Sequence, residues 1–335
     1  MACCVVVGGA YGDEGKGKII SYLALKDNPS IAVRGGVGPN AGHTIEYKGK
    51  TLKLRMLPSA VVNPGTKLLV GAGVLVDPQV FLKEVTELGC ESRARVDRNC
   101  AIIESKHIAM DKEGYLKDRI GTTGTGTGPA NSDRVLRAGK VACQEPLLSG
   151  YLEDVADSVN RALDKRENVL IEGTQGTLLS LYHGDYPYVT SKDVSASGIL
   201  SDVGVGPKRV DEVLVVFKAY LTRVGGGTLE GELTENEVLK RGWQEFGSVT
   251  GRLRRAAPFN FRLAKRAVVL NSATQIAVTK LDSVFPETTH NRLFSDLSPE
   301  AVGFIEKVEA ELGTPVVYIG TGPDAEDIID RRSAE

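Results

Sequence analysis

Several features are scarce in this sequence, and their scarcity narrows the classes of protein to consider. The five cysteines include no CxxC pair, a pattern that favours a reduced, cytosolic protein over a disulfide framework. A pair between Cys90 and Cys100 is the alternative if the source is a hyperthermophile. No stretch approaches the ~18 consecutive apolar residues of a membrane span. The first residues also lack a basic segment followed by an apolar run and a cleavage site, so we expect a cytoplasmic location.

Neither sign of charge predominates. Lys and Arg number 41 against 43 Asp and Glu, which gives a formal net charge of −2. That balance gives no support for broad binding to nucleic acid or to an anionic membrane, and we expect neither partner. With 41% hydrophobic and 25% charged residues, the composition is that of an ordinary globular protein and excludes a largely disordered chain.

Glycine, in contrast, is abundant, with 38 residues in the chain. Such an excess points to tight turns and to loops that approach a ligand closely. Between the glycine-rich segments, short apolar runs alternate with amphipathic stretches. The runs suit strands that are buried on both faces of a mostly parallel sheet. We predict strands at 3–8, 31–34, 67–71, 100–104, 168–172, 213–217, 276–280 and 315–319. We predict helices at 16–26, 78–89, 151–166, 260–271 and 298–312.

This alternation predicts an α/β fold, with a mostly parallel central sheet flanked by helices. No break in composition divides the chain, so residues 1–335 are predicted to form one large domain. A glycine loop between the first strand and the first helix relates the fold to the P-loop NTPases. That loop is atypical, however: the spacing from Gly9 to Lys16 is one residue too long, and Gly17 replaces the Ser or Thr that would hold Mg²⁺.

The first loop, residues 8–18, places bare backbone N–H groups and a helix N-terminus around an anion site. Lys16 adds a positive charge suited to phosphate. Asp13 lies inside this loop, where its carboxylate would repel phosphate unless it binds a metal or serves as a base. A tight strand–helix turn without a ligand is the alternative interpretation.

The other polar loops are also candidate ligand sites. Residues 34–44 contain Asn40, Gly42 and His43 directly after a predicted strand, where open α/β sheets bind ligands. Residues 121–128 (GTTGTGTG) are as typical of a linker as of an anion-binding loop. Residues 252–255 carry three arginines, which suit phosphates or a doubly acidic substrate, although a solvated turn explains them equally well. Thr279–Asp282 is similar to the guanine-reading signature of GTP-binding proteins.

Taken together, these motifs resemble the adenylosuccinate synthetase family, in its compact archaeal-like form. The matching segments are GDEGKGK at 12–18, NAGHT at 40–44, GTTGTGTGPA at 121–130, EGTQGTLL at 172–179, HGDYPYVTS at 183–191, VTGRLRR at 249–255, TKLD at 279–282 and GTGPD at 320–324. They occur in the family's order and span nearly the whole chain.

The resemblance implies a GTP-dependent ligase of purine biosynthesis. GTP would phosphorylate the 6-oxygen of IMP, and L-aspartate would then displace that phosphate to give adenylosuccinate, GDP and phosphate. By matching positions, the catalytic residues are Asp13, His43, Lys16 and Gln175. One Mg²⁺ per subunit is expected on Asp13 and on the carbonyl of Gly42.

The resemblance also assigns the binding residues. The GTP set is Gly12, Asp13, Glu14, Gly15, Lys16, Gly17, Lys18, Gly42, His43, Thr44, Arg254, Lys280, Leu281, Asp282, Gly320, Thr321 and Gly322. The IMP set is Asp13, Lys16, Asn40, Ala41, Gly42, His43, Thr123, Arg137, Gln175, Thr190 and Arg252. The aspartate set is Val249, Thr250, Gly251, Arg252, Leu253 and Arg254. A homodimer is implied, with Arg137 reaching the IMP phosphate of the neighbouring subunit.

Two alternatives remain at this point. A phage-type synthetase that joins aspartate to dGMP resembles the same compact chains, but it is expected to dispense with the Asp13-type carboxylate. A GTP-binding switch without ligase activity would need a hydroxyl residue where Gly17 stands, and it would leave His43, Arg252 and Arg254 without a role.

Overall fold

A ten-stranded sheet runs through the molecule. The computed structural model describes residues 2–247 and 251–332. From one edge to the other, the strands are β16 (Ile328–Asp330), β15 (Val316–Gly320), β14 (Gln275–Thr279), β11 (Glu212–Lys218), β1 (Cys3–Gly8), β10 (Val169–Gly176), β2 (Ile31–Arg34), β5 (Lys67–Val70), β7 (Ala94–Asp97) and β9 (Leu152–Glu153). Every neighbouring pair is parallel except β15 and β16. Strands from both ends of the chain therefore join one sheet, which confirms the predicted fold class.

The central strand β1 is buried on both of its faces. Cys3, Val5 and Val7 belong to one hydrophobic cluster, whereas Cys4 and Val6 belong to another. Because successive side chains of a strand point to opposite faces, a continuous apolar run suits a sheet that is covered on both sides.

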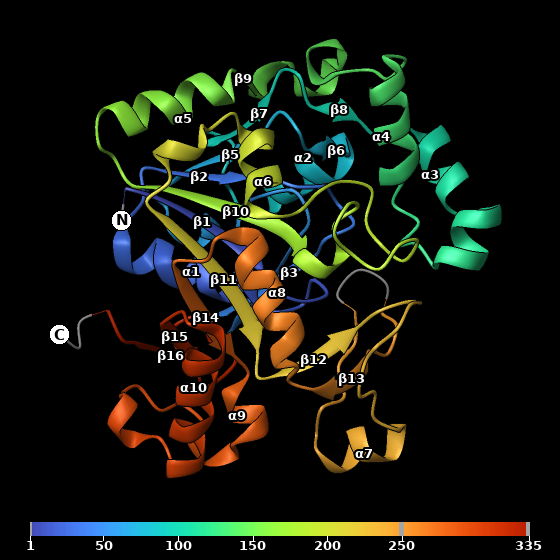
Figure 1. The fold of residues 1–335 in the computed structure, drawn as a ribbon. Coiled ribbons are helices and arrows are strands. Elements are labelled where there is room, and N and C mark those ends of the chain that lie inside the picture. Colours follow the sequence, from blue (N-terminus) through green and yellow to red (C-terminus); the bar gives the residue numbers. More distant parts are fainter. Residues whose placement is uncertain (1, 248–250, 333–335) are drawn as a thin grey trace.

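Helices supply that cover (Figure 1). The first cluster packs α5 (Val155–Asp164), α6 (Ala196–Val203), α8 (Phe261–Asn271) and α10 (Pro299–Leu312) against the sheet. The second cluster packs α1 (Lys16–Asp27) and α2 (Pro78–Glu87) against the opposite face. The remaining helices are α3 (Ser105–Asp111), α4 (Thr127–Leu136), α7 (Glu235–Lys240) and α9 (Leu281–Val284).

Local signals explain where the longer helices begin and end. The Asp77 carboxylate accepts hydrogen bonds from the N–H groups of Gln79 and Val80, and Pro78 occupies the first position of α2. Ser298 caps α10 in the same manner. That helix ends at Gly313, whose left-handed backbone (φ 66°) suits glycine.

Three small sheets extend the core. β3 (His43–Tyr47) and β4 (Lys50–Leu54) form an antiparallel hairpin. β12 (Tyr220–Arg223) and β13 (Arg255–Pro258) pair antiparallel across a long connection that includes α7, and β6 (Leu75–Val76) runs parallel to β8 (Ala101–Ile102). The prediction for 100–104 is therefore wrong in one respect: this run forms only β8 and lies outside the main sheet. Short helical turns occupy Ser59–Val62, Leu116–Ile120, Ala142–Gln144, Pro146–Tyr151, Thr177–Leu179, Pro207–Arg209, Pro286–Thr288 and Phe294–Asp296.

The other predicted elements lie close to their expected positions. The helix predicted at 151–166 begins only at Val155, because Pro146–Tyr151 forms a helical turn and Leu152–Glu153 forms β9. The sequence did not predict the β3–β4 hairpin, the β12–β13 pair, the short strands β6, β7, β9 and β16, or the helices α3, α4, α6, α7 and α9. All five cysteines are free, so Cys90 and Cys100 do not pair. Within 2–247 and 251–332, no helix has the length and apolar character needed to cross a membrane.

Candidate active site

The carboxyl ends of neighbouring strands bring distant motifs together. β1, β10 and β11 lie side by side, and β14 and β15 follow β11 across the sheet. Their last residues are Gly8, Gly176, Lys218, Thr279 and Gly320. Because parallel strands present their carboxyl ends at one edge of a sheet, the loops that follow them meet there.

The loop after β1 wraps around a carboxylate of its own chain. Oε1 of Glu14 accepts hydrogen bonds from the N–H groups of Ala10 (2.9 Å) and Gly12 (2.8 Å). Its Oε2 lies 2.9 Å from Nζ of Lys16, and both side chains are almost fully buried. Burial alone would raise the pKa of Glu14, but the charge and hydrogen bond of Lys16 hold it below the ordinary value. The loop is thus a cradle for negative charge, as its glycines and its lysine predict.

Glycine at position 17 lets the β3–β4 hairpin approach this loop. A Cβ atom there would lie 3.2 Å from both the Cβ of His43 and the Oγ of Ser59. A side chain at this position would require His43 or Ser59 to shift by a few tenths of an ångström. Glycine therefore suits the close packing of His43 against the phosphate loop.

Asp13 lies in a cluster of charged groups that are partly or fully buried. Its Oδ2 accepts a hydrogen bond from the hydroxyl of Thr222 and lies 3.3 Å from a guanidinium nitrogen of Arg254 and 3.5 Å from Nζ of Lys218. Glu245 joins the cluster, with Oε2 at 2.5 Å from Arg254 and 2.9 Å from Lys218. The positive charges of Lys218 and Arg254 offset the negative charges of Asp13 and Glu245. This network holds the Asp13 side chain in place at the mouth of the loop.

His43 begins β3 and contacts an acceptor through each ring nitrogen. Nδ1 contacts Oε1 of the fully buried Glu172, and Nε2 lies 3.0 Å from the carbonyl oxygen of Thr174. Burial and the charge of Arg34 lower the pKa of His43, whereas Glu172 acts in the opposite direction. A neutral imidazole has a single N–H, so only the protonated ring donates to both acceptors. The ring is consequently placed to hold and release a proton.

Glu172 in turn is fixed from several sides. It accepts hydrogen bonds of 2.6 Å from both the N–H and the hydroxyl of Ser59. Burial would raise its pKa, but His43 and Arg34 keep it below the ordinary value. A carboxylate held in this way orients the ring that it contacts.

A cavity of about 380 Å³ opens beside Asp13. Its size suits a small-molecule ligand. The predicted site residues that line it are Gly12, Asp13, Asn40, Ala41, Gly42, Thr123, Gln175, Thr190 and Arg254. The glycine-rich segment 121–128 thus contributes to the cavity wall through Gly121, Thr122, Thr123, Thr127 and Gly128, rather than acting as a linker.

Several buried polar atoms at the site have no hydrogen-bond partner within the described part of the chain. They include Oδ1 of Asn40, Nε2 of Gln175, Nε of Arg254 and Oδ1 of Asp282. Buried polar groups are nearly always paired in folded proteins. Four such atoms in predicted site residues therefore indicate groups that a ligand satisfies.

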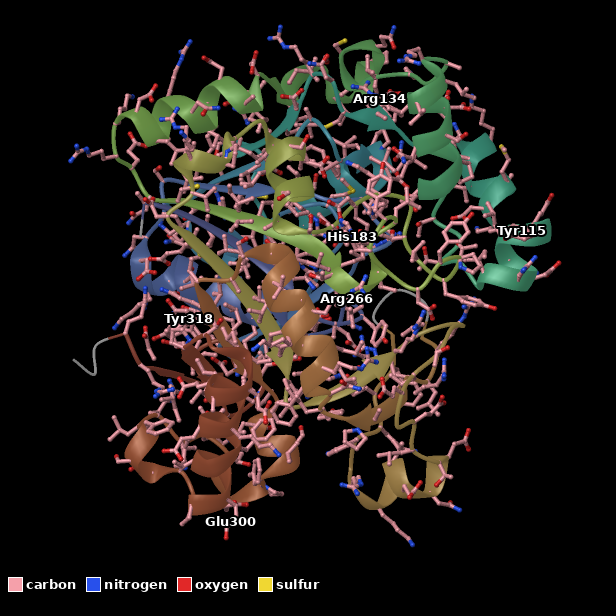
Figure 2. The ribbon with its side chains drawn as sticks, in the orientation of Figure 1. Tyr115, Arg134, His183, Arg266, Glu300 and Tyr318 are labelled. Carbon is pink, nitrogen blue, oxygen red and sulfur yellow. The ribbon has the colours of Figure 1, made fainter. Side chains whose placement is uncertain are left out.

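Two segments from the second half of the chain close the cavity. The segment with Pro187 and Tyr188 lines it, and helix α8 fastens the start of that segment, because Arg266 donates a hydrogen bond of 3.0 Å to the carbonyl of His183 (Figure 2). Arg252 donates to the carbonyl of Gly121 at 2.8 Å and so contacts the glycine-rich segment. Gly251 and Leu253 are exposed beside it, whereas Val249 and Thr250 lie outside the described residues.

The guanine-type motif lies on the other side of the phosphate loop. The Thr279 hydroxyl donates to the carbonyl of Glu14 at 2.6 Å. Nζ of Lys18 donates to the carbonyls of Gly322 and Asp327, the latter at 2.8 Å. Burial lowers the pKa of Lys18 to about 8. Lys18 thus ties helix α1 to the 320–327 loop.

The other residues predicted to bind the guanine end of GTP lie near the same motif. Lys280 is exposed and has a left-handed backbone (φ 59°), Leu281 is fully buried and Thr321 donates from its hydroxyl to the carbonyl of Asn291 at 2.8 Å. Hydrogen bonds and burial therefore hold the backbone around this motif, and Asp282 lies in the first turn of α9.

Arg137 stands apart from the rest. It follows α4 with a left-handed backbone (φ 61°), is exposed, and is not among the residues that line the cavity. Its neighbours Val135 and Leu136 are 63% and 70% exposed, although both are apolar. Within one described chain, the structure therefore does not bring Arg137 to the other IMP residues.

Sequence reasoning missed several charged or polar residues of the site: Arg34, Glu172, Lys218, Thr222 and Glu245. Three of them share a signal, because Arg34, Glu172 and Lys218 each directly follow apolar residues of a buried strand. A charge at that point is costly unless it is paired. Glu245 and Thr222 carry no comparable signal.

Comparison with known proteins agrees with the geometry. The family model described as adenylosuccinate synthetase matches residues 5–145 and 140–285. The curated adenylosuccinate synthetase of Methanococcus aeolicus is 52% identical over 336 residues, which cover 99% of this chain and 100% of the relative.

Solved structures show the same fold. The fully ligated adenylosuccinate synthetase of Plasmodium falciparum superposes with a TM-score of 0.93 at 25% identity, covering 99% of this chain and 100% of the other. The cyanophage S-2L succinoaminodeoxyadenylate synthetase, bound to dGMP and dATP, gives a TM-score of 0.80 at 24% identity over 98% of this chain and 95% of the other. That second likeness shows the fold alone.

Proposed function

Because the chain belongs to the adenylosuccinate synthetase family and is a GTP-dependent ligase of L-aspartate and IMP, we propose that both steps take place between the phosphate loop and the cavity beside Asp13. The observation that carries this proposal is the position of Asp13: a partly buried carboxylate in the phosphate loop, paired with Lys218 and on the wall of a cavity of ligand size.

Asp13 is the general base of the first step. The 6-oxygen of IMP is a poor nucleophile until the N1 proton leaves, and a carboxylate within reach of that proton accepts it. The 6-oxygen then takes the γ-phosphoryl group of GTP, and GDP leaves. In the second step, the amino group of L-aspartate attacks carbon 6, and phosphate departs with the oxygen.

His43, Lys16 and Gln175 support the same chemistry. Nε2 of His43, which lies 3.0 Å from the Thr174 carbonyl oxygen, exchanges that acceptor for the phosphoryl group in transfer, while Glu172 orients the ring through Nδ1. Lys16 and the N–H groups of residues 12–17 offset the charge on the phosphates. Gln175, whose amide nitrogen has no partner among the described residues, contacts the 6-oxygen side of IMP.

The IMP and aspartate sets share the cavity wall. Asn40, Ala41, Thr123, Thr190 and Arg252 bind IMP. Residues 249–254 bind L-aspartate, because their arginines match a doubly acidic substrate. The hydrogen bonds of the Arg252 side chain to the carbonyls of Gly121 and Thr122 support a single site for both substrates.

Asp282, Lys280, Leu281 and residues 320–322 bind the guanine base of GTP. The Asp282 carboxylate, whose Oδ1 has no partner among the described residues, is the acceptor for the guanine N1–H and 2-amino groups. Glu14, Gly15, Lys18 and Thr44 shape the phosphate end of the GTP site through the contacts of the loop and of helix α1.

Asp13 and Gly42 fit a magnesium ion. Both line one cavity, and both offer hard oxygen atoms, the donors that Mg²⁺ takes together with substrate phosphates. The ion would neutralise charge on the phosphates. The Asp13 carboxylate and the Gly42 carbonyl would hold it on the wall of the cavity that both residues line.

The active unit is a homodimer with Arg137 acting in trans. Arg137 does not line the cavity of its own chain, it is exposed, and it sits beside the exposed apolar pair Val135 and Leu136. An apolar helix end next to an arginine suits an interface that buries the pair and delivers the guanidinium to the partner's IMP phosphate.

An ultraviolet assay of aspartate condensation tests this function directly. IMP and dGMP are compared side by side, each with GTP, Mg²⁺ and L-aspartate. Adenylosuccinate formation with IMP, and phosphate release that requires both IMP and aspartate, are expected. Turnover with dGMP alone would favour the phage-type reaction, and phosphate release from GTP alone would favour a switch protein.

A further inference from the structure

Lys218 and Thr222 contact the Asp13 carboxylate but are not among the described residues that line the cavity. Lys218 is the last residue of β11, and Thr222 lies on β12. Their exposed fractions are only 3% and 1%. Neither belongs to a motif that the sequence singled out.

The hydrogen-bond directions between these residues follow from their chemistry. An ammonium group only donates, so Lys218 donates to Oγ1 of Thr222, at 2.6 Å. The threonine hydroxyl carries a single hydrogen, and its other contact is with Oδ2 of Asp13. Lys218 therefore directs the hydroxyl hydrogen of Thr222 onto Asp13.

The contacts with Asp13 all converge on one oxygen. Thr222 donates its hydroxyl hydrogen to Oδ2, and the shortest approaches of Arg254 and Lys218 to Asp13 are to the same oxygen. Among the described residues, none donates a hydrogen bond to Oδ1. A general base needs one oxygen within hydrogen-bond reach of the proton that it abstracts. Fixing Oδ2 sets the rotation of the carboxylate and leaves Oδ1 available to a ligand in the cavity that Asp13 lines.

We propose that Thr222 and Lys218 are positioning residues for Asp13: a relay from the ammonium through the hydroxyl to Oδ2 aims Oδ1 at the reacting nucleotide. This inference rests on the proposed role of Asp13 as the base. The competing explanation is structural, in which Lys218 only balances the charge of Glu245, 2.9 Å away.

Thr222→Val and Thr222→Ser form a matched pair that separates these explanations. Valine keeps the shape of threonine but lacks the hydroxyl, whereas serine keeps the hydroxyl. We expect Thr222→Val to lose kcat by about 10- to 100-fold, the effect typical of a lost outer-shell orienting contact. KM for GTP and for IMP should stay unchanged, because the contact matters only in the transition state. Thr222→Ser should restore kcat.

Thermal melts of both variants exclude a merely structural effect. Wild-type kcat in Thr222→Val, or equally low kcat in a folded Thr222→Ser, overturns the proposal. A purely structural role would lower the melting temperature of Thr222→Val without this split between kcat and KM.

A double-mutant cycle with Lys218→Met tests the relay itself. If Lys218 acts through Thr222, the double variant should be no slower than the slower single variant. Multiplying effects would overturn the relay. The Thr222 pair decides the role of the hydroxyl even if Lys218→Met does not fold.

Asp13→Asn separates this inference from the function on which it rests. If Asp13→Asn retains full turnover, Asp13 is not the base and the proposed function fails. If Asp13→Asn is inactive and Thr222→Val is fully active, only the positioning role fails.

Discussion

Oε2 of Glu14 lies 2.9 Å from Nζ of Lys16, with both side chains 1% exposed. The Glu14 carboxylate also accepts hydrogen bonds from the N–H groups of Ala10 and Gly12. The lysine and two N–H groups of the glycine loop are therefore paired with an anion of the same chain.

Replacing Glu14 by Gln removes that internal anion. Breaking one partner of a buried ion pair leaves an uncompensated charge and costs about 3–5 kcal/mol of unfolding free energy. Urea unfolding without ligands should show that loss. Saturating GTP and IMP should shrink the difference from wild type, since phosphate oxygens can replace the carboxylate. The exposed Glu300→Gln variant serves as the control, and a ligand-independent loss would contradict the prediction.

Asp13→Asn tests the base. The amide keeps the shape of the carboxylate but does not accept the N1 proton of IMP, so turnover should fall by roughly 10²–10⁴-fold. IMP binding, measured by calorimetry, should largely survive. Near-wild-type turnover in the purified variant would refute the assignment.

Asp282→Asn tests which group reads the base. The exchange presents an N–H₂ group to the guanine donors, and each unpaired buried donor costs about 1–3 kcal/mol. The kcat/KM for GTP should therefore fall, whereas the kcat/KM for xanthosine triphosphate, which has an acceptor at position 2, should rise. The ratio of the two kcat/KM values is the measurement, and an unchanged ratio would mean that Asp282 does not contact the base.

Lys18 predicts a pH dependence of stability. Burial lowers its pKa to about 8 in the folded protein, whereas an unfolded lysine titrates near about 10.4. Between these values the unfolded chain binds more protons, so this group makes the unfolding free energy rise with pH. Lys18→Met should show a smaller rise between about pH 8 and 10, and the exposed Lys26→Met should keep the wild-type rise. Parallel curves for all three proteins would contradict it.

The sequence predicted the main sheet well because its evidence is local. Continuous apolar runs such as Val5 to Val7 indicate strands buried on both faces, and the Asp77–Pro78 pair marks the start of a helix. Ala101–Ile102 was assigned to the wrong sheet, because a short apolar run does not tell which strands it will pair with.

The site was predicted in part for the same reason. Glycine-rich loops indicate an anion-binding site, and the order of the motifs along the chain indicated the family. The partners of Asp13 and His43 were not predicted, because Thr222 and Glu172 are 209 and 129 residues away along the chain. The pairing of β1 with β11 brings Asp13 to Thr222, and the pairing of β2 with β10 brings His43 to Glu172.

The shared site is tested by mixing two defective variants. Arg137→Leu should raise KM for IMP by roughly tenfold or more, because a charge-assisted contact is lost. Asp13→Asn should instead remove turnover. Each homodimer carries its defect in both sites, so these two preparations are the controls, and exchange between differently tagged subunits verifies that heterodimers form.

If Arg137 acts in trans, the two active sites of a heterodimer carry different numbers of substitutions. One site combines the intact Asp13 with the partner's intact arginine, and the other site carries both changes. Activity at low IMP should therefore return to about half of the wild-type value per heterodimer. If Arg137 acts within its own chain, each site keeps one defect and nothing is regained. No recovery despite verified exchange, or a fully active monomer, would rule out an active site completed by the neighbouring subunit.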